Sequence, residues 1–249
     1  MSEEAAAPLV LRADADGVAT LTLNRPEKRN ALNVDVFVAL DAHLAALEAQ
    51  TDTVGVVVLR ANGPIFSAGA DLGKQQRAPK RDFQARTIER LAGLPQPVVA
   101  AVHAPCFTGG LELVLAADII LAAESARFAD THAKWGLVPG WGMSQRLPRR
   151  VGTFKAREMM FTARQIDGRT AERIGLANIC VADDAFEAEL AALTKDIASL
   201  SWHSHRGNKR LIVDTEDMAL AQGLAHEIHR GPGRAPDFEE RVGSTFGQR

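Results

Sequence analysis

A short polar cluster stands out in the stretch FADTHAKWGLVPGW, residues 128–141. Asp130, Thr131 and His132 lie there between a phenylalanine and two tryptophans. A histidine has an ordinary pKa of about 6.5, so it can transfer a proton near neutral pH. A polar residue that only ends a surface helix would give the same pattern. The role of His132 therefore depends on what the fold places opposite it.

A second candidate is Glu112, in the first turn of the helix predicted for GGLELVLAAD. An acid at that point could simply complement the helix dipole. The residues around it are apolar, however, and a helix that is apolar on all sides is typically buried. A buried carboxylate needs a partner or a raised pKa, which prepares it for general acid–base catalysis.

Two loops have the composition for close contact with a ligand. The segment FSAGADL, residues 66–72, leaves its backbone bare between small side chains, directly after a predicted buried strand. The pair Gly109 and Gly110 opens the helix of Glu112, where N–H groups lack partners within the helix. Two such donors that converge on one carbonyl oxygen would form an oxyanion hole. Taken singly, each loop could equally be a tight strand-to-helix turn.

Hydrophobic periodicity predicts the elements that must position these groups. Strands are predicted on both sides of the Asp-Gly turn in LVLRADADGVATLTLNRP and at VGVVVLR, PVVAAVHA, DIILAAE and ANICVAD. Helices are predicted at NVDVFVALDAHLAALEAQ with Asn33 as N-cap, around residues 83–94, and repeatedly after Thr153. This alternation predicts an α/β fold with a mostly parallel sheet. We expect residues 1–8 to be a disordered tail, 9–190 the core and 191–249 a helical C-terminal part.

Charge and composition argue against other classes of protein. The 249 residues carry a formal net charge of −2, whereas nucleic-acid surfaces draw on clustered Lys and Arg. No apolar stretch reaches the ~18 to 20 residues that span a membrane, and the N-terminus does not resemble a secretory signal, so we expect a cytoplasmic protein. Cys106 and Cys180 lack the spacing of a zinc or redox motif, and the histidines lack Cys or Asp co-ligands, so no metal is expected.

A resemblance to a known family rests on NRPEKRNAL, FSAGADL, TGGLELVLAADIILAAESARFAD, GLVPGWGMSQRLPRRVG and GLANIC, in this order over roughly residues 10–225. They resemble the crotonase superfamily, the enoyl-CoA hydratases and isomerases. The resemblance implies a right-handed spiral of ββα turns for the core. It also implies a C-terminal part that drives trimerisation, with trimers that often pair into hexamers. The implied ligand is an acyl-CoA thioester, so coenzyme A is part of the substrate and no separate cofactor is expected.

The same resemblance implies roles for particular residues. The N–H groups of Ala70 and Gly109 would polarise the thioester carbonyl and stabilise an enolate. Glu112 matches the first of two glutamates between which the family's hydratases hold a water. The residues implied to line the substrate are Lys28, Arg29 and Ala31 for coenzyme A, and Ala68, Asp71, Leu72 and Gly73 near the thioester. Trp141 is expected to pack under the acyl chain or in the core.

His132 occupies the position of the second glutamate, and this departure leaves three functions open. We expect His132 to act with Glu112 in adding water to a 2-enoyl-CoA. In the first alternative it only lines the pocket, while Glu112 alone serves an enoyl-CoA isomerase or an acyl-CoA hydrolase. In the second, the protein binds acyl-CoA without turnover. Asp130 could also swing in towards the substrate, although capping of the segment that follows is favoured.

Overall fold

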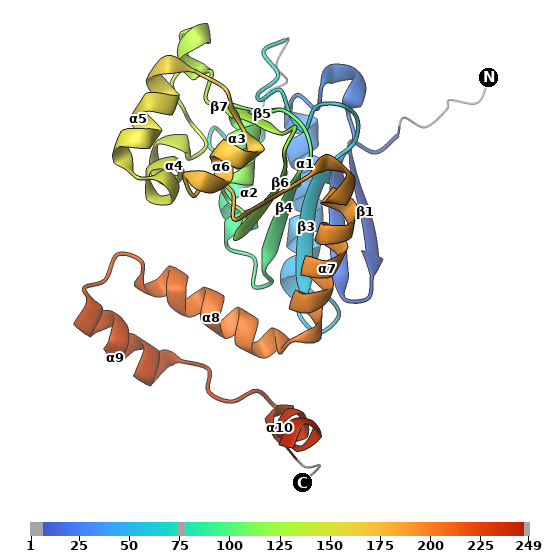
Figure 1. Ribbon diagram of the computed structural model, residues 1–249, viewed down its shortest axis with the longest axis vertical. Helices are drawn as coiled ribbons and strands as arrows, with labels where there is room; N and C mark the ends of the chain where they lie inside the picture. The colour runs from blue at the N-terminus through green and yellow to red at the C-terminus, as the bar shows by residue number, and fades with distance from the viewer. Residues whose placement is uncertain (1–6, 74–77, 247–249) are drawn as a thin grey trace, which may run out of the picture.

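A mostly parallel sheet forms the centre of the computed structural model, which describes residues 7–73 and 78–246 (Figure 1). The sheet has six strands in the order β1-β2-β3-β4-β6-β9. β1 pairs antiparallel with β2, and the later neighbours pair in parallel. The strands are β1 Val10–Ala15, β2 Val18–Leu23, β3 Val56–Ala61, β4 Val98–Val102, β6 Ile119–Ala123 and β9 Ile179–Val181. Each coincides with a segment that was predicted to be a strand, which confirms the α/β fold. Most of the predicted tail, residues 1–6, lies outside the described residues.

A second, smaller sheet joins the two segments that carry the candidate residues. It contains β5 Cys106–Phe107, β7 Arg127–Ala129 and β8 Ile166–Asp167. β5 and β7 run parallel, with Phe107 opposite Ala129. The chain before Gly109 and the chain before Asp130 therefore lie side by side. Periodicity does not predict strands of two or three residues, since they are shorter than any repeat that could be recognised.

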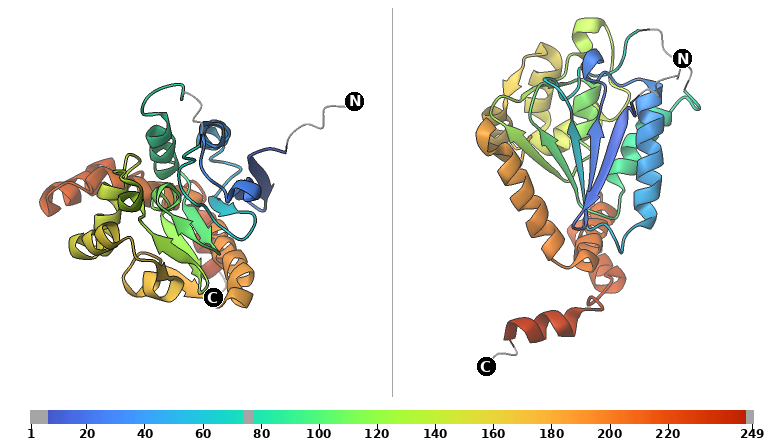
Figure 2. Two further views of the ribbon diagram at one scale, coloured as in Figure 1. Left: turned by 90° about the horizontal axis from the view of Figure 1, so that it is seen from above. Right: turned by 90° about the vertical axis from the view of Figure 1, so that its right-hand side faces the viewer.

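Helices pack against both faces of the main sheet (Figures 1 and 2). Asn33 caps the first long helix by accepting a hydrogen bond from Val36 N, as predicted. A helix directly after Gly142 was not predicted, because Pro148 interrupts its pattern. The helical segments up to residue 199 are η1 Pro26–Lys28, α1 Val34–Ala49, α2 Phe83–Ala92, α3 Gly109–Val114, η2 His132–Trp135, α4 Met143–Val151, α5 Thr153–Thr162, α6 Gly168–Arg173, η3 Asp183–Ala185 and α7 Phe186–Ser199.

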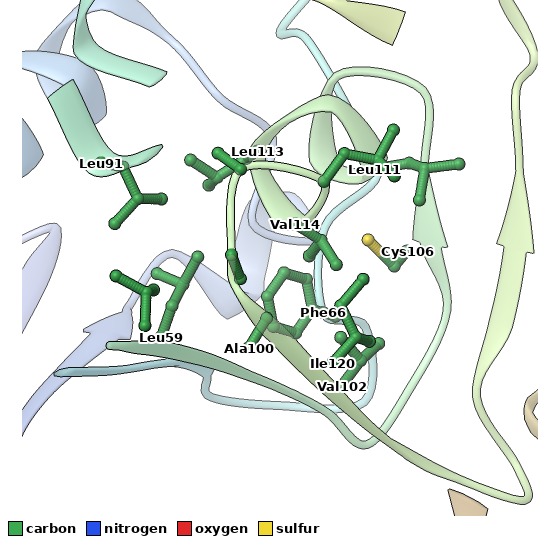
Figure 3. Packing of buried hydrophobic residues seen from close by; sticks show 14 of the residues in the cluster. Leu59, Phe66, Leu91, Ala100, Val102, Cys106, Leu111, Leu113, Val114 and Ile120 are labelled. Atoms are coloured by element: carbon green, nitrogen blue, oxygen red, sulfur yellow. The ribbon is translucent and has the colours of Figure 1, made fainter. Parts of the chain in front are cut away.

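The core fixes the position of α3. Successive side chains of β3 enter different apolar clusters, Val57 on the face of α1 and α3 and Val58 on the face of α7, as expected for a strand buried on both faces. Leu111 and Val114 of α3 lie in the first cluster (Figure 3). Glu112 is thus a charged residue on a helix whose apolar neighbours hold it in the interior.

The C-terminal helices extend away from the sheet (Figures 1 and 2). They are α8 Trp202–Thr215, α9 Leu220–Arg230 and α10 Phe238–Phe246. Lys209 holds α8 to the core through an ion pair with Asp118 at 2.7 Å. Among the helices predicted after Thr153, the segment NKRLIVDTEDMALAQGLAHEI is predicted as one helix; this is wrong, because Ala219 is extended and begins α9 as its N-cap. Neither Gly nor Pro marks this break. The domain boundary predicted at residue 190 falls within α7 and stays a prediction.

Candidate active site

The backbone N–H groups of Ala70 and Gly109 lie close together where two loops meet. Leu32 forms a parallel bridge with the first loop, donating to Gly69 O at 2.8 Å and accepting from Asp71 N at 3.0 Å. In such a bridge the N–H of Ala70 points away from Leu32. Gly109 begins α3, so its N–H has no partner within the helix. A Cβ on Gly109 would lie only 3.1 Å from Ala70 N. No acceptor in the described part of the chain receives either N–H.

Thr108, directly before Gly109, turns the chain into α3 with a strained backbone. Its φ of 52° is in the left-handed region, which costs a non-glycine residue about 1 to 3 kcal/mol. Contacts with the neighbouring segment hold it there: Thr108 N donates to Ala129 O at 2.9 Å, and its hydroxyl oxygen accepts from Thr131 N at 3.1 Å. The two threonine hydroxyls also bond each other. The start of α3 and the segment of His132 are therefore fixed as one unit.

Glu112 is buried, with 1% of its surface exposed, and one of its oxygens is fully engaged. Oε1 accepts hydrogen bonds from the backbone N–H of Trp141 at 2.9 Å and of Met143 at 3.1 Å. Burial raises the pKa of Glu112, and these two hydrogen bonds and the charge of His132 lower it by less. The carboxyl group is therefore fixed in orientation, and its second oxygen, Oε2, is left to face His132.

His132 lies directly opposite this second oxygen. Its Nε2 is 3.7 Å from Glu112 Oε2, too far for a direct hydrogen bond. A water about 2.8 Å from each atom would lie to one side of the line that joins them. Burial lowers the pKa of the His132 imidazole, but the hydrogen bond and charge of Asp130 and the charge of Glu112 outweigh it, so the net pKa is raised. The pair thus combines a carboxylate with an imidazole that favours its protonated form.

Asp130 holds the far side of the imidazole. It is buried, and its Oδ1 accepts from His132 Nδ1 at 2.5 Å and from the backbone N of His132 at 3.1 Å. The bond to the backbone N holds Asp130 at the start of η2, although the N-cap residue of η2 is Thr131. The bond to the ring was not foreseen, because the sequence does not reveal which way an aspartate two residues away points. His132, not Asp130, faces Glu112.

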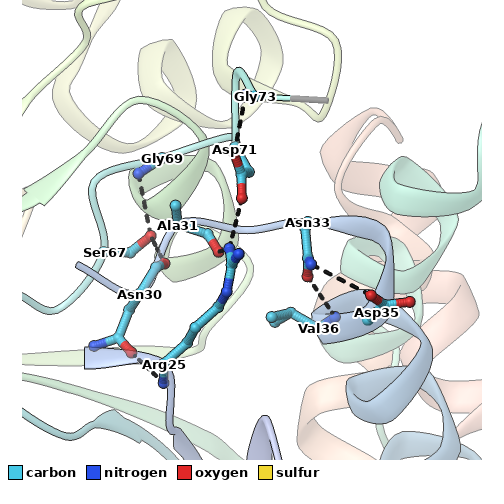
Figure 4. A network of polar contacts seen from close by, with 10 residues as sticks. All are labelled: Arg25, Asn30, Ala31, Asn33, Asp35, Val36, Ser67, Gly69, Asp71 and Gly73. Carbon is cyan, nitrogen blue, oxygen red and sulfur yellow. Dashed lines mark hydrogen bonds and ion pairs between the residues drawn. The ribbon is translucent and has the colours of Figure 1, made fainter. Parts of the chain in front are cut away.

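A polar network joins the loop of Ala70 to the segment 25–31 (Figure 4). The Arg25 guanidinium binds Asp71 Oδ2 at 2.6 Å and Ala31 O at 3.1 Å. The Ser67 hydroxyl donates to Asn30 O at 2.9 Å and accepts from Gly69 N at 3.2 Å. The Arg25–Asp71 and Ser67–Asn30 contacts join residues 46 and 37 positions apart in the chain, so they hold segments 25–31 and 67–71 together. Arg25, Asn30 and Ser67 lie within NRPEKRNAL and FSAGADL, but no pattern in these motifs predicts the bonds of their side chains.

The residues expected to line the substrate fall into two groups. Lys28, Arg29, Ala68, Leu72 and Gly73 are exposed around this network, with Ala31 half-buried among them. Asp71 differs, because its carboxylate is engaged by Arg25 and by Gly73 N at 3.0 Å. The hydrogen bond from Arg25 and then that from Gly73 lower the pKa of Asp71. Asp71 is therefore an ionised anchor of the loop.

Trp141 packs at the start of α3. Its ring meets Phe37 edge-on with centroids 5.0 Å apart. A Cβ on Gly109 would lie 2.5 Å from the Trp141 ring, so glycine is needed there for steric reasons as well as for the turn. Trp141 also donates its backbone N–H to Glu112. Trp141 thus packs against Gly109 and also binds the carboxyl group of Glu112.

Neither a metal site nor a membrane span is found within residues 7–73 and 78–246. No group of three or more His, Cys, Asp or Glu side chains there is arranged to hold a metal ion. No helix in the same ranges is long and apolar enough to cross a membrane.

Comparison with known proteins identifies the family. Residues 13–230 match the family model described as enoyl-CoA hydratase/isomerase. The chain belongs to this family. A probable enoyl-CoA hydratase of Rhizobium meliloti (strain 1021) is 36% identical over 214 residues, which cover 84% of this chain and 83% of the relative. These findings confirm the resemblance on which the implied roles rest.

Solved structures of the enoyl-CoA hydratase/isomerase family confirm the fold. The enoyl-CoA hydratase of Bacillus anthracis has a TM-score of 0.89 at 30% identity and covers 97% of each chain. A monofunctional enoyl-CoA isomerase of Mycobacterium smegmatis has a TM-score of 0.77 at 33% identity, covering 88% of this chain and 99% of the other. Hydratases and an isomerase of the family thus share this fold, so the reaction has to be argued from the site.

Proposed function

We propose that the protein is an enoyl-CoA hydratase that adds water across the C2–C3 double bond of a 2-enoyl-CoA thioester. The observation that carries this proposal is the pair formed by Glu112 Oε2 and His132 Nε2, 3.7 Å apart and beside the two unpaired N–H donors. Hydration needs one group that takes a proton from water and another that gives a proton to carbon. An enzyme that only shifts a double bond can use a single group for both transfers.

The N–H groups of Ala70 and Gly109 would receive the thioester oxygen. As hydroxide adds to C3, negative charge moves onto that oxygen, where preorganised donors stabilise the enolate. Lys28 and Arg29, both exposed at the strip beside the Ala70 loop, suit the anionic phosphates of coenzyme A. Coenzyme A belongs to the substrate, and the reaction requires no further cofactor.

The proton transfers balance over Glu112 and His132. Glu112 Oε2 takes one proton of the bridging water while the oxygen of that water bonds to C3. The His132 imidazolium gives its Nε2 proton to C2, and the enolate collapses to the 3-hydroxyacyl thioester. One proton has then passed from His132 to Glu112, and exchange through the next water returns it. The pKa of each group is raised, which favours Glu112 as the final proton holder and His132 as the initial one.

Loss of enoyl-thioester absorbance on addition of purified protein tests this function. We expect turnover with at least one of crotonyl-, hexenoyl- and decenoyl-CoA, and a 3-hydroxyacyl-CoA product. Isothermal titration with a saturated acyl-CoA of the same length measures binding in parallel. Binding without hydration at any length would contradict the proposal and favour a non-catalytic binding protein. Conversion of a 3-enoyl-CoA to its 2-enoyl isomer without hydration would favour an isomerase.

We further propose that the C-terminal helices join three copies of the chain into a trimer, which can pair into a hexamer. α8 and α9 project from the core and carry exposed apolar side chains, which a second copy would cover: Ile212, Val213, Leu220, Leu224 and Ile228. Light scattering of the full chain measures the mass, and a monomer at micromolar concentration would contradict this assembly. The cytoplasm is the proposed compartment, and cell fractionation tests it.

A further inference from the structure

We infer that Asp130 is a positioning residue of this site: it fixes the tautomer of His132, so that Nε2 is the only ring nitrogen that exchanges a proton with Glu112. The catalytic consequence rests on the proposed hydration, whereas the tautomer itself does not. The unit is a chain of three buried groups, Asp130, His132 and Glu112, joined through the two nitrogens of one imidazole.

The geometry leaves the imidazole little freedom. One oxygen of Asp130 binds both the ring Nδ1 and the backbone N of His132. Thr131, which lies between Asp130 and His132 in the chain, is bonded to Thr108 through its backbone N at 3.1 Å and through its hydroxyl. Side chain and backbone of the segment are thus held from two directions. Ring rotation that moved Nε2 away from Glu112 would break the bond to Asp130.

The chemistry of the partners determines where the protons lie. An ionised carboxylate only accepts hydrogen bonds, so Nδ1 must carry a hydrogen. In the neutral ring Nε2 is then a bare acceptor, and in the imidazolium it is a donor. The other neutral tautomer, with the hydrogen on Nε2, could neither accept a proton from Glu112 nor release one readily. Asp130 excludes that unproductive form.

This arrangement replaces the second carboxylic acid of a two-glutamate site. Glu112 and His132 share one proton in either of its two locations, so the pair always contains one acid and one base. The charged groups that face the imidazole are Asp130 and Glu112, and Arg146 of α4 adds its charge near Glu112. With Asp130 ionised, the three residues Asp130, His132 and Glu112 carry a net charge of −1 in both states.

Asp130→Asn is the direct test. Asparagine can still accept from the backbone N of His132, but it offers no charge to the ring. We expect kcat to fall about 10²-fold, on the scale of one positioned proton-transfer group, with little change in KM. The alkaline limb of the kcat profile should also move to lower pH, because the pKa of His132 falls without Asp130. Asp167→Asn is the matched control, since Asp167 also bonds a backbone N–H, that of Thr170 at 2.7 Å, and has no bond to the ring.

Introducing Asp130→Asn into a His132→Glu variant separates a positioning role of Asp130 from a merely structural one. A glutamate needs no tautomer, so adding Asp130→Asn to His132→Glu should leave kcat unchanged or raise it, because two like charges are no longer adjacent. Equal losses from Asp130→Asn in both backgrounds, with equal losses of melting temperature, would overturn the inference.

Ring ¹⁵N spectra of histidine-labelled protein, assigned with His132→Gln, report the tautomer without any reaction. We expect neutral His132 to be protonated at Nδ1 in the wild type and to lose this preference in Asp130→Ala, which leaves Nδ1 without its acceptor. Protonation at Nε2 in the wild type would contradict the inference. If the wild type shows the Nδ1 tautomer but hydrates no enoyl-CoA, the proposed function fails while the role of Asp130 in fixing the ring stands.

Discussion

Glu112 and His132 face each other, yet the two regions that carry them are held in different ways. α3 lies in the core, and backbone N–H groups of Trp141 and Met143 fix the Glu112 carboxyl. The segment of His132 is a short turn whose next residues are exposed, and the side chain of Asp130 fixes its ring. A substitution other than proline keeps the backbone N–H of Trp141 or Met143, whereas any substitution of Asp130 removes the carboxylate that binds the ring. The orientation of Glu112 is therefore robust, and that of His132 is adjustable.

This difference suggests where the chemistry of the site can vary. The donors Ala70 and Gly109 belong to the backbone, and the strained Thr108 supports the second of them. Any site of this kind needs such donors to stabilise an enolate. The identity of the group opposite Glu112 can change without disturbing them, because it lies on a separate segment. In the proposed reaction, the backbone donors would stabilise charge and His132 would deliver a proton.

Glu112→Gln removes the carboxylate that the backbone donors hold in place, and it should have the largest effect. The amide oxygen can still accept from Trp141 N and Met143 N, so folding should be preserved. Without a base, kcat should fall by about 10³-fold or more, with KM nearly unchanged. Steady-state kinetics and a thermal melt measure the two properties. Wild-type turnover in this variant would refute the assignment of the site.

Gly109→Ala tests the donor beside Glu112 and should have the next largest effect. The new Cβ would lie 2.5 Å from the Trp141 ring. Relief of that clash displaces the N–H of residue 109 and the backbone N of Trp141, so we expect kcat to fall about 10²-fold. Unfolding in urea should show a loss of about 1 to 3 kcal/mol of stability.

Gly140→Ala is the matched control for that variant, because nothing lies within 4 Å of a Cβ at Gly140. It should keep both kcat and stability near their wild-type values. If the two glycine variants behaved alike, the close approach of Gly109 to Trp141 would not matter for catalysis.

Much of the fold could be predicted because long apolar runs and caps are local signals. β3, β4 and β6 coincide with continuous apolar segments, and Asn33 begins α1 as expected. The small sheet could not be predicted, since its strands are too short to show a period. The break at Ala219 has no Gly or Pro, so only the structure reveals that α8 and α9 are separate.

The site, like the fold, could be predicted only in part from the sequence. A buried Glu112 and bare backbone at two loops follow from composition, and the structure brings these groups together. The Arg25–Asp71 pair, 46 residues apart in the chain, has no sequence pattern that would announce it. The bond from Asp130 to the imidazole depends on two side-chain rotamers, which periodicity does not encode. Long-range pairs and rotamers are thus the parts that sequence alone leaves open.

The pH dependence of kcat, compared between the wild type and His132→Glu, tests the shared-water pair most directly. In the wild type, activity should be lost as the pH falls through the raised pKa of Glu112, because the base becomes protonated. It should also be lost as the pH rises through the raised pKa of His132, because the acid becomes deprotonated. The account predicts a bell-shaped profile whose alkaline limb disappears or moves in His132→Glu. An alkaline limb that is the same in both proteins would contradict it.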